Sequence, residues 1–426
     1  MTVTDSPPNQ QEVPPTPAGV IAMVRQIGSA AAPHAVRHDR EASFVTEGYE
    51  AIRDHGYGVI AVPRELGGGG HGLATVCRAQ SILARYCVNT SLAIAMHQHN
   101  VLALAWRWRL GDTAVEQTLR RIAHEGLILS SSGSADPANP GVTAAPVEGG
   151  LLVTGGKRFC SGVPGADLVL TMARVDDGTS QRTTTVLVPT SDPGTEVVPD
   201  WDAMGMRGSG SNPVSFSEVF VPEANIIDFG PIRGRAGFGR SGTRRQAAAV
   251  TDAPAPGAAD GQASGPPARR ITDGHRLPGL QIALAVIASV YLGAAGGMRD
   301  RALRMTAARG TADPVQRRLA GLMTSEFRSA GWALDRLIAD TTDESVGTEN
   351  HFVTTMLAKR QVILSSIRIV ELAMELLGSR SYMRALPFEQ ALRDVRAGIT
   401  HPLSPEKTLE EVGRSALEFF AGQQDR

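Results

Sequence analysis

The spacing of apolar residues changes twice along this chain, and that order limits the folds it can adopt. Over residues 18–126, apolar side chains recur every three or four positions, as expected for one face of a helix. Over residues 127–225, short β-rich runs alternate with Gly, Pro, Asp and Asn, which is typical of antiparallel strands joined by turns. Long helical patterns return after Pro278 and continue to about Leu392. The sequence therefore predicts an α+β protein in which a β-domain separates two helical domains.

We expect five segments along the chain. They are a disordered N-terminus (1–17), an N-terminal helical domain (18–126), an antiparallel β-barrel or sandwich domain (127–228), a flexible insertion (229–278) and a C-terminal helical domain (279–426). The insertion is dominated by Gly, Pro, Ala and Arg, as in APAPGAADGQASGPPARR, a composition that does not build a packed core. Its arginines either stay solvated or grip a phosphate.

The charge balance and the cysteines exclude several classes of protein. Lys and Arg total 42 against 43 Asp and Glu, so no excess charge attracts nucleic acid or an anionic membrane. Cys77, Cys87 and Cys160 lack metal-type spacing, and their odd number argues against a disulfide framework. Residues 282–297 are the most apolar but are short for a membrane span, which favours a buried helix. We expect a cytoplasmic protein without a signal peptide or membrane span.

A turn rich in Gly and Ser leads directly into an alternating strand. Residues 204–222 read MGMRGSGSNPVSFSEVFVP, and the glycines permit the backbone conformations of a tight turn. Apolar residues then follow at near-regular period two, which marks a half-buried strand: Val214, Phe216, Val219 and Val221. The residues alone indicate a turn that closes a sheet. The wording also resembles the signature at the end of the β-domain of acyl-CoA dehydrogenases.

Other stretches resemble the same family, in the expected order. They are residues 56–70 (GYGVIAVPRELGGGG), 153–162 (VTGGKRFCSG) and 386–394 (LPFEQALRD). The resemblance covers roughly residues 18–400, apart from the insertion. It implies an N-terminal helical domain, a β-domain and a C-terminal four-helix bundle, with a flavin between the β-domain and the bundle. It also implies FAD (or FMN), a small-molecule substrate, a homo-oligomer (dimer or tetramer), and an electron-transfer flavoprotein or flavin reductase as electron partner.

The resemblance also assigns flavin contacts. Phe159 stands for the aromatic side chain that packs against the isoalloxazine, and Ser161 for the hydroxyl that bonds its polar edge and takes part in catalysis. Ser130, Ser131 and Ser132 occupy the place of a flavin-binding loop and offer hydroxyl and backbone N–H donors. Without the resemblance, each would be interpreted as an ordinary turn serine.

Two further residues resemble the family's contacts to a neighbouring subunit's cofactor. Arg309 and Gln316 match positions that reach the diphosphate and adenosine of FAD, and an arginine fork suits phosphate. The alternative is a helix-surface arginine, because the Phe-Gly that usually accompanies this motif is missing here.

The usual catalytic base of the family is absent. In most members, a Glu shortly after an Arg-Asp pair removes the substrate's α-proton. Here Arg393-Asp394 is followed by VRAGITHPLSPEK, in which Glu406 lies several residues too far along. The family's second location for the base matches about Ala283, which is no acid. His401 remains, because imidazole exchanges protons near neutral pH.

His401 has two interpretations. It either takes part in catalysis or caps the helix that Pro402 ends. Ser161 and His401 together resemble a branch that includes the dibenzothiophene-monooxygenase type, in which reduced flavin activates O₂. His97 or His99 offers a second imidazole, although a helical histidine is more often packed or solvated.

Three functions follow from these residues. The first is an acyl-thioester dehydrogenase that uses FAD and an unusual base, ranked first because most of the superfamily catalyses this reaction. The second is a two-component monooxygenase that uses reduced FMN or FAD on a small aromatic or natural-product substrate. The third is a catalytically silent relative that binds acyl groups or partners, and the retained flavin contacts argue against it.

Overall fold

The computed structural model describes residues 13–131, 140–176, 181–227, 276–342 and 349–424. Most of the expected N-terminal segment and almost all of the expected insertion lie outside these ranges. The first half of the described chain is helical, as predicted. Its helices are α1 (Pro17–Ala31), α2 (Ala35–Glu41), α3 (Thr46–Asp54), α4 (Leu73–Ala84), α5 (Val88–Arg109) and α6 (Glu116–Glu125). Helix α5 is buried along most of its length, so it forms the centre of this part.

The middle of the chain forms one mixed sheet. Its strands are β1 (Leu129–Ser131), β2 (Val142–Val147), β3 (Gly150–Lys157), β4 (Leu168–Asp176), β5 (Gln181–Pro189), β6 (Thr195–Val197), β7 (Val214–Pro222) and β8 (Ile226–Ile227). The order is β6-β7-β3-β2-β4-β5-β8, and β1 pairs with β4. Within the described residues the strands do not close into the predicted barrel. Two pairs, β1–β4 and β2–β4, are parallel because residues 158–167 carry the chain across the sheet before β4 begins.

The predicted alternation in β7 is confirmed, with one irregularity. Val214, Phe216, Val219 and Val221 are all at most 2% exposed. The two pairs are separated by Ser217 and Glu218, and Glu218 has a left-handed φ of 53°. The pairing of β7 with β3 shifts register at this point. A β-bulge therefore restores the inward direction of Val219 after the extra residue.

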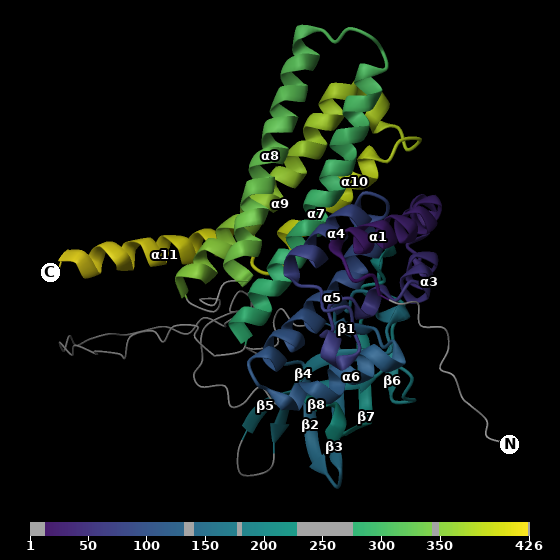
Figure 1. The fold of residues 1–426 in the computed structure, drawn as a ribbon, viewed down its shortest axis with the longest axis vertical. Coiled ribbons are helices and arrows are strands. Elements are labelled where there is room, and N and C mark those ends of the chain that lie inside the picture. Colours follow the sequence, from purple (N-terminus) through teal and green to yellow (C-terminus); the bar gives the residue numbers. More distant parts are fainter. Residues whose placement is uncertain (1–12, 132–139, 177–180, 228–275, 343–348, 425–426) are drawn as a thin grey trace, which may run out of the picture.

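The described residues 276–342 and 349–424 contain three long α-helices and two shorter ones. They are α7 (Arg276–Ala307), α8 (Pro314–Thr342), α9 (Glu349–Leu377), α10 (Phe388–Arg396) and α11 (Pro405–Gln424). Figure 1 shows α7, α8 and α9 extending away from the sheet, with the N-terminal helices beside them. The breaks expected at residues 313–314 and 378–379 are confirmed as the ends of these helices. Helix α11 projects sideways from the body (Figure 1).

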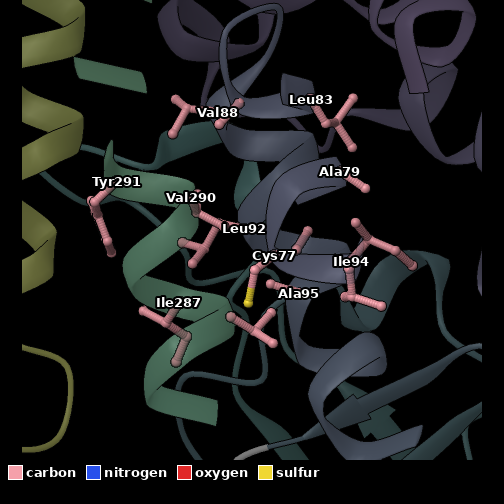
Figure 2. Close-up of a cluster of buried hydrophobic side chains, with 14 of the residues drawn as sticks. Cys77, Ala79, Leu83, Val88, Leu92, Ile94, Ala95, Ile287, Val290 and Tyr291 are labelled. Carbon is pink, nitrogen blue, oxygen red and sulfur yellow. The ribbon is translucent and has the colours of Figure 1, made fainter. Parts of the chain in front are cut away.

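Helix α7 joins the two helical parts. It is longer than the apolar run at 282–297 indicates: residues 279–307 are long and apolar enough to cross a membrane, but 83% of the most apolar window is buried inside the protein. Figure 2 shows Val290 on the side of α7 that faces Leu92 of α5 and Cys77 of α4. A Cβ on Gly293 would lie 2.1 Å from the Ser81 carbonyl oxygen, so glycine permits this close approach. Helix α7 is therefore placed as a core helix.

Candidate active site

Three of the predicted serines meet where β1 lies beside the 158–167 connection. The buried Ser130 hydroxyl donates to the Ser161 carbonyl oxygen over 3.1 Å. Ser131 forms an isolated antiparallel bridge with Ser161, and its hydroxyl receives a hydrogen bond of 3.0 Å from the Asn100 side chain. Ser132 lies outside the described residues. The structure thus brings Ser130, Ser131 and Ser161 together from segments about 30 positions apart.

Phe159 forms an exposed aromatic surface next to these serines. Its side chain is 67% exposed, and its backbone has a left-handed φ of 63°, a conformation that non-glycine residues adopt at a cost. Trp201 lies edge-on to it, with ring centroids 6.1 Å apart and planes at 84°. The Trp201 indole donates to the Met206 carbonyl oxygen over 2.9 Å, which holds the ring in place.

These groups fit the isoalloxazine of a flavin. An open aromatic side chain offers a stacking partner to a flat heterocycle, and the serines supply hydrogen-bond donors to its polar edge. Phe159 and Ser161 would hold the ring, with Trp201 fixing the Phe159 side. Sequence reasoning missed Trp201, although a tryptophan three residues before the 204–222 signature was a visible signal.

Ser211 and Ser209, which the sequence did not indicate as site residues, are linked to Ser161 by hydrogen bonds. Its hydroxyl oxygen is 2.7 Å from that of Ser211, which is in turn 2.7 Å from that of Ser209. All three side chains are buried. Ser209 and Ser211 both lie within the GSGS turn (residues 208–211). From the sequence alone, this turn was expected only to close the sheet.

His401 lies in the loop after α10, in a partly apolar setting. Its ring centroid is 5.6 Å from that of the buried Tyr291 on α7, with a tilted arrangement. Figure 2 shows Tyr291 pointing away from the α4–α5 contact of its helix. Burial, and then the nearby charge of Lys359, lower the pKa of His401 to about 4. The imidazole is therefore neutral at physiological pH, and it makes no hydrogen bond within the described part of the chain.

The predicted capping role of His401 is filled by another residue. The ammonium group of Lys359, on α9, donates to the carbonyl oxygens of Gly398, His401 and Leu403 over 3.3, 3.1 and 2.9 Å. Lys359 is only 1% exposed, and burial lowers its pKa to about 8. Since Lys359 binds the backbone carbonyl oxygens of this loop, the His401 side chain is not needed to cap them.

The two histidines of α5 differ in their surroundings. His97 is fully buried: the Leu129 amide donates to its Nδ1 over 3.0 Å, so its Nε2 carries the proton and donates to the Gly58 carbonyl oxygen over 2.6 Å. Burial lowers the pKa of His97 to about 4. His97 is thus a structural residue that fixes β1 to the helices. His99 is partly buried, and burial lowers its pKa to about 3; its Nδ1 has no partner among the described residues.

Arg309 and Gln316 are not brought to this site within one chain. Arg309 is exposed in the connection between α7 and α8, at the end of the bundle farthest from the sheet (Figure 1). Gln316 forms a capping box at the start of α8: its amide donates to Asp313 Oδ1 over 2.8 Å, and its Oε1 accepts from the Asp313 amide over 3.1 Å. Glu406 is exposed in the first turn of α11.

The 204–210 turn joins all three parts of the molecule. The Met206 amide donates to Asp394 of α10 over 2.5 Å, and the Gly208 amide to Asn89 of α5 over 3.1 Å. A Cβ on Gly205 would lie 2.3 Å from the Arg393 carbonyl oxygen. Burial raises the pKa of Asp394 to about 7. The signature therefore holds the sheet against both helical parts, and its glycine permits contact with α10.

Arg393 completes this junction. Its guanidinium forms a two-pronged ion pair with Asp39 of α2, over 2.9 and 2.6 Å, and donates to the Met204 carbonyl oxygen over 3.0 Å. It also pairs with Glu389 one turn earlier on α10. The Arg-Asp pair of the motif thus carries contacts between the parts of the molecule.

Family models match two parts of the chain. Residues 19–124 match the N-terminal domain of acyl-CoA dehydrogenases, and residues 130–219 match their middle domain. The putative acyl-CoA dehydrogenase YdbM of Bacillus subtilis (strain 168) is 24% identical over 402 residues, covering 90% of this chain and 93% of that protein. The amino sugar nitrososynthase DnmZ of Streptomyces peucetius is 26% identical over 423 residues, covering 95% of each chain.

Solved structures show the same fold. KijD3 in complex with FMN and dTDP-3-amino-2,3,6-trideoxy-4-keto-3-methyl-D-glucose is 25% identical with a TM-score of 0.77, covering 96% of this chain and 95% of that one. Dibenzothiophene monooxygenase (TdsC) from Paenibacillus sp. A11-2 is 20% identical with a TM-score of 0.75, covering 94% and 97%. The expected three-part architecture is thereby confirmed.

Proposed function

Since the chain belongs to the acyl-CoA dehydrogenase superfamily of flavoproteins, we propose that it is a flavin-dependent monooxygenase that uses FMN supplied in reduced form by a separate reductase. Relatives over the whole length include an amino sugar nitrososynthase, and a neighbouring structure of 25% identity holds FMN and an amino sugar nucleotide. These support an electron-rich nitrogen or sulfur atom of a small natural product as the site of oxidation. A soluble, cytoplasmic homo-oligomer remains part of the proposal.

The observation that carries this proposal is the missing carboxylate: the loop after α10 holds His401 where most of the family carries the Glu that removes the α-proton, and Glu406 is exposed on α11. Burial and Lys359 lower the pKa of His401 to about 4, so its imidazole is neutral at physiological pH. A neutral imidazole remains a good hydrogen-bond partner for a polar substrate atom. We therefore rank monooxygenase above dehydrogenase in this proposal, the reverse of the order that the sequence favours.

A flavin bound here in reduced form would supply the two electrons needed to reduce O₂, with one oxygen atom going to the substrate and the other to water. Phe159 and Ser161 would hold the flavin ring on the sheet side. His401 would lie on the bundle side and accept a hydrogen bond from the substrate, with the ring of the fully buried Tyr291 packed 5.6 Å from its own.

Two assays test the proposal. Oxidised protein carrying flavin is mixed anaerobically with a panel of acyl-CoAs while the visible flavin absorbance is followed; we expect no bleaching. The same protein is then given reduced FMN, O₂ and an amino sugar nucleotide or an aromatic heterocycle, and we expect oxygen in the product. Bleaching by any acyl-CoA would establish a dehydrogenase and contradict the proposal.

A further inference from the structure

The hydroxyl of Ser161 is the outer end of a row of three. Ser161, Ser211 and Ser209 are linked oxygen to oxygen by two hydrogen bonds of 2.7 Å. Their exposed fractions are 6%, 3% and 0%, so the row runs from the rim of the site into the interior. Hydrogen bonds in such a low-dielectric setting polarise one another.

The backbone holds this row in place without help from the hydroxyls. The Gly162 amide donates to the Ser209 carbonyl oxygen over 2.9 Å, and the Cys160 amide donates to the Asn212 carbonyl oxygen over 3.2 Å. On the other side, the Ser130 hydroxyl fixes the Ser161 carbonyl oxygen. The separation of the three oxygens is therefore set by the fold.

Counting protons favours one direction for the row. Each hydroxyl has one proton, so Ser211 donates to one neighbour and accepts from the other. If Ser161 donates inward, the last proton belongs to Ser209, which is fully buried and has no second side-chain partner among the described residues. A buried donor without an acceptor is costly. If the row runs outward, the last proton belongs to Ser161, next to the exposed Phe159.

We propose that Ser211 is a positioning residue that donates its proton to Ser161 and so leaves the Ser161 hydroxyl free to donate to the bound flavin. This inference rests on the proposed function, because it takes Ser161 as a flavin contact. It gives the serines of the GSGS turn a purpose beyond turn geometry: the turn carries the groups that orient the site.

The test is a double-mutant cycle on flavin affinity. Oxidised FMN, or FAD if the unaltered protein binds only that, is titrated into the unaltered protein and into Ser161→Ala, Ser211→Ala and the double variant, with flavin fluorescence as readout. From the typical worth of one hydrogen bond, we expect affinity to fall about tenfold in Ser161→Ala and about fivefold in Ser211→Ala. Because Ser211 acts through Ser161, the double variant falls only about tenfold. Ser211→Thr keeps the hydroxyl and restores affinity, and Ser217→Ala, which removes an exposed serine of β7, changes nothing.

Other outcomes overturn the inference in distinguishable ways. If the two losses multiply to about fiftyfold, or if Ser211→Ala binds flavin normally while Ser161→Ala does not, Ser211 does not act through Ser161 and the proposed function stands. If the unaltered protein binds neither FMN nor FAD, the proposed function fails together with the inference. Melting curves of the flavin-free variants separate a loss of affinity from a loss of folding.

Discussion

At the scale of single residues, the histidines of this protein divide by what their nitrogens contact. His97 is saturated by two backbone groups, and its neutral form is required because Nδ1 accepts the Leu129 amide. His401 is neutral for another reason, since burial and a neighbouring ammonium group disfavour its cation. The same residue type thus serves the fold in one case and is free for a ligand in the other.

The His97 pair of hydrogen bonds predicts a pH-dependent stability. The folded pKa of about 4 lies below the usual 6.5, so the unfolded chain binds a proton that the folded chain does not between these values. The contribution of His97 is therefore full above pH 6.5 and is lost as the pH falls towards 4, by about 3 kcal/mol. The free energy of unfolding is measured by denaturant titration at pH 7 and pH 4.5. At pH 7 we expect His97→Ala to be less stable than the unaltered protein, and at pH 4.5 this difference in the free energy of unfolding should be smaller.

Asp394 and His401 are present in both His97→Ala and the unaltered protein, so their contributions to the pH dependence of stability cancel in the difference. The control is Gln98→Ala, which removes a buried hydrogen bond of the same helix, to the Tyr57 carbonyl oxygen, without removing a titratable group. The difference in stability between this variant and the unaltered protein should not narrow on acidification. A difference for His97→Ala that stays constant between the two pH values would contradict the assigned proton positions.

The charge of Lys359 should lower the pKa of His401 beyond the effect of burial. Replacing Lys359 by Met removes the nearby charge, so the pKa of His401 should rise, although it stays below 6.5 because burial remains. Lys359→Arg keeps the charge and should leave the pKa low. The measurement is an NMR titration of ¹³C-labelled histidines, with the His401 signal assigned by its loss in His401→Ala. An unchanged His401 pKa in the Met variant would show that the ammonium group has no such effect.

At the scale of elements, Gln316 at the start of α8 has two possible roles. Gln316 matches a family contact to a neighbouring copy's flavin, and it also completes a capping box with Asp313. The capping contacts are seen within one chain, while the flavin contact remains a prediction that requires a second chain. The two roles make different demands on the side chain, so substitutions can separate them.

Gln316→Ala should destabilise the protein by about 1 kcal/mol, because it removes one half of the capping box. Gln316→Glu keeps an acceptor for the Asp313 amide and should preserve stability. If Gln316 also contacts the phosphates of a flavin, the added negative charge of the Glu variant lowers flavin affinity. Thermal melting and flavin titration of both variants measure the two effects, and normal affinity in Gln316→Glu would remove Gln316 from the flavin site.

The elements also show what the sequence can and cannot reveal. The change from helical to alternating periodicity predicts the order of the domains, because burial of one face sets the local pattern. Ser130, Ser131, Phe159 and Ser161 came from motif resemblance. Trp201, Ser211 and Lys359 were missed, since their roles depend on partners from distant segments that no local pattern encodes. The open sheet was missed for the same reason, because alternation does not say which strands pair.

At the scale of the whole molecule, a small number of polar contacts at the 204–210 turn join the sheet to the N-terminal and C-terminal helices. The ion pair of Arg393 with Asp39 links α10 to α2, and both side chains are largely buried, at 26% and 7% exposed. Met204 and Met206 bind the same helix through their backbones. This junction therefore holds α10 against the turn and α2, while the bonds of His97 separately fix β1 to the N-terminal helices.

Arg393→Ala should destabilise the protein by about 3 kcal/mol, because it leaves the Asp39 carboxylate buried without its partner. Arg414→Ala is the matched control: it removes an arginine that pairs with Glu411 and Glu418 on the exposed helix α11, and it should cost less than about 1 kcal/mol. Denaturant unfolding followed by circular dichroism compares the two. Equal losses in both variants would show that the junction is no more important than a surface ion pair.

The 204–211 turn has a consequence for how this scaffold can acquire new substrates. The same eight residues hold the domains together and carry Ser209 and Ser211, so most changes there would harm folding and flavin orientation at once. The residues nearest His401 that the structure describes, Tyr291 of α7 and Lys359 of α9, make no hydrogen bond to that turn. Selection for a different substrate, in nature or in the laboratory, should therefore accumulate changes on the bundle side and leave the turn as it is.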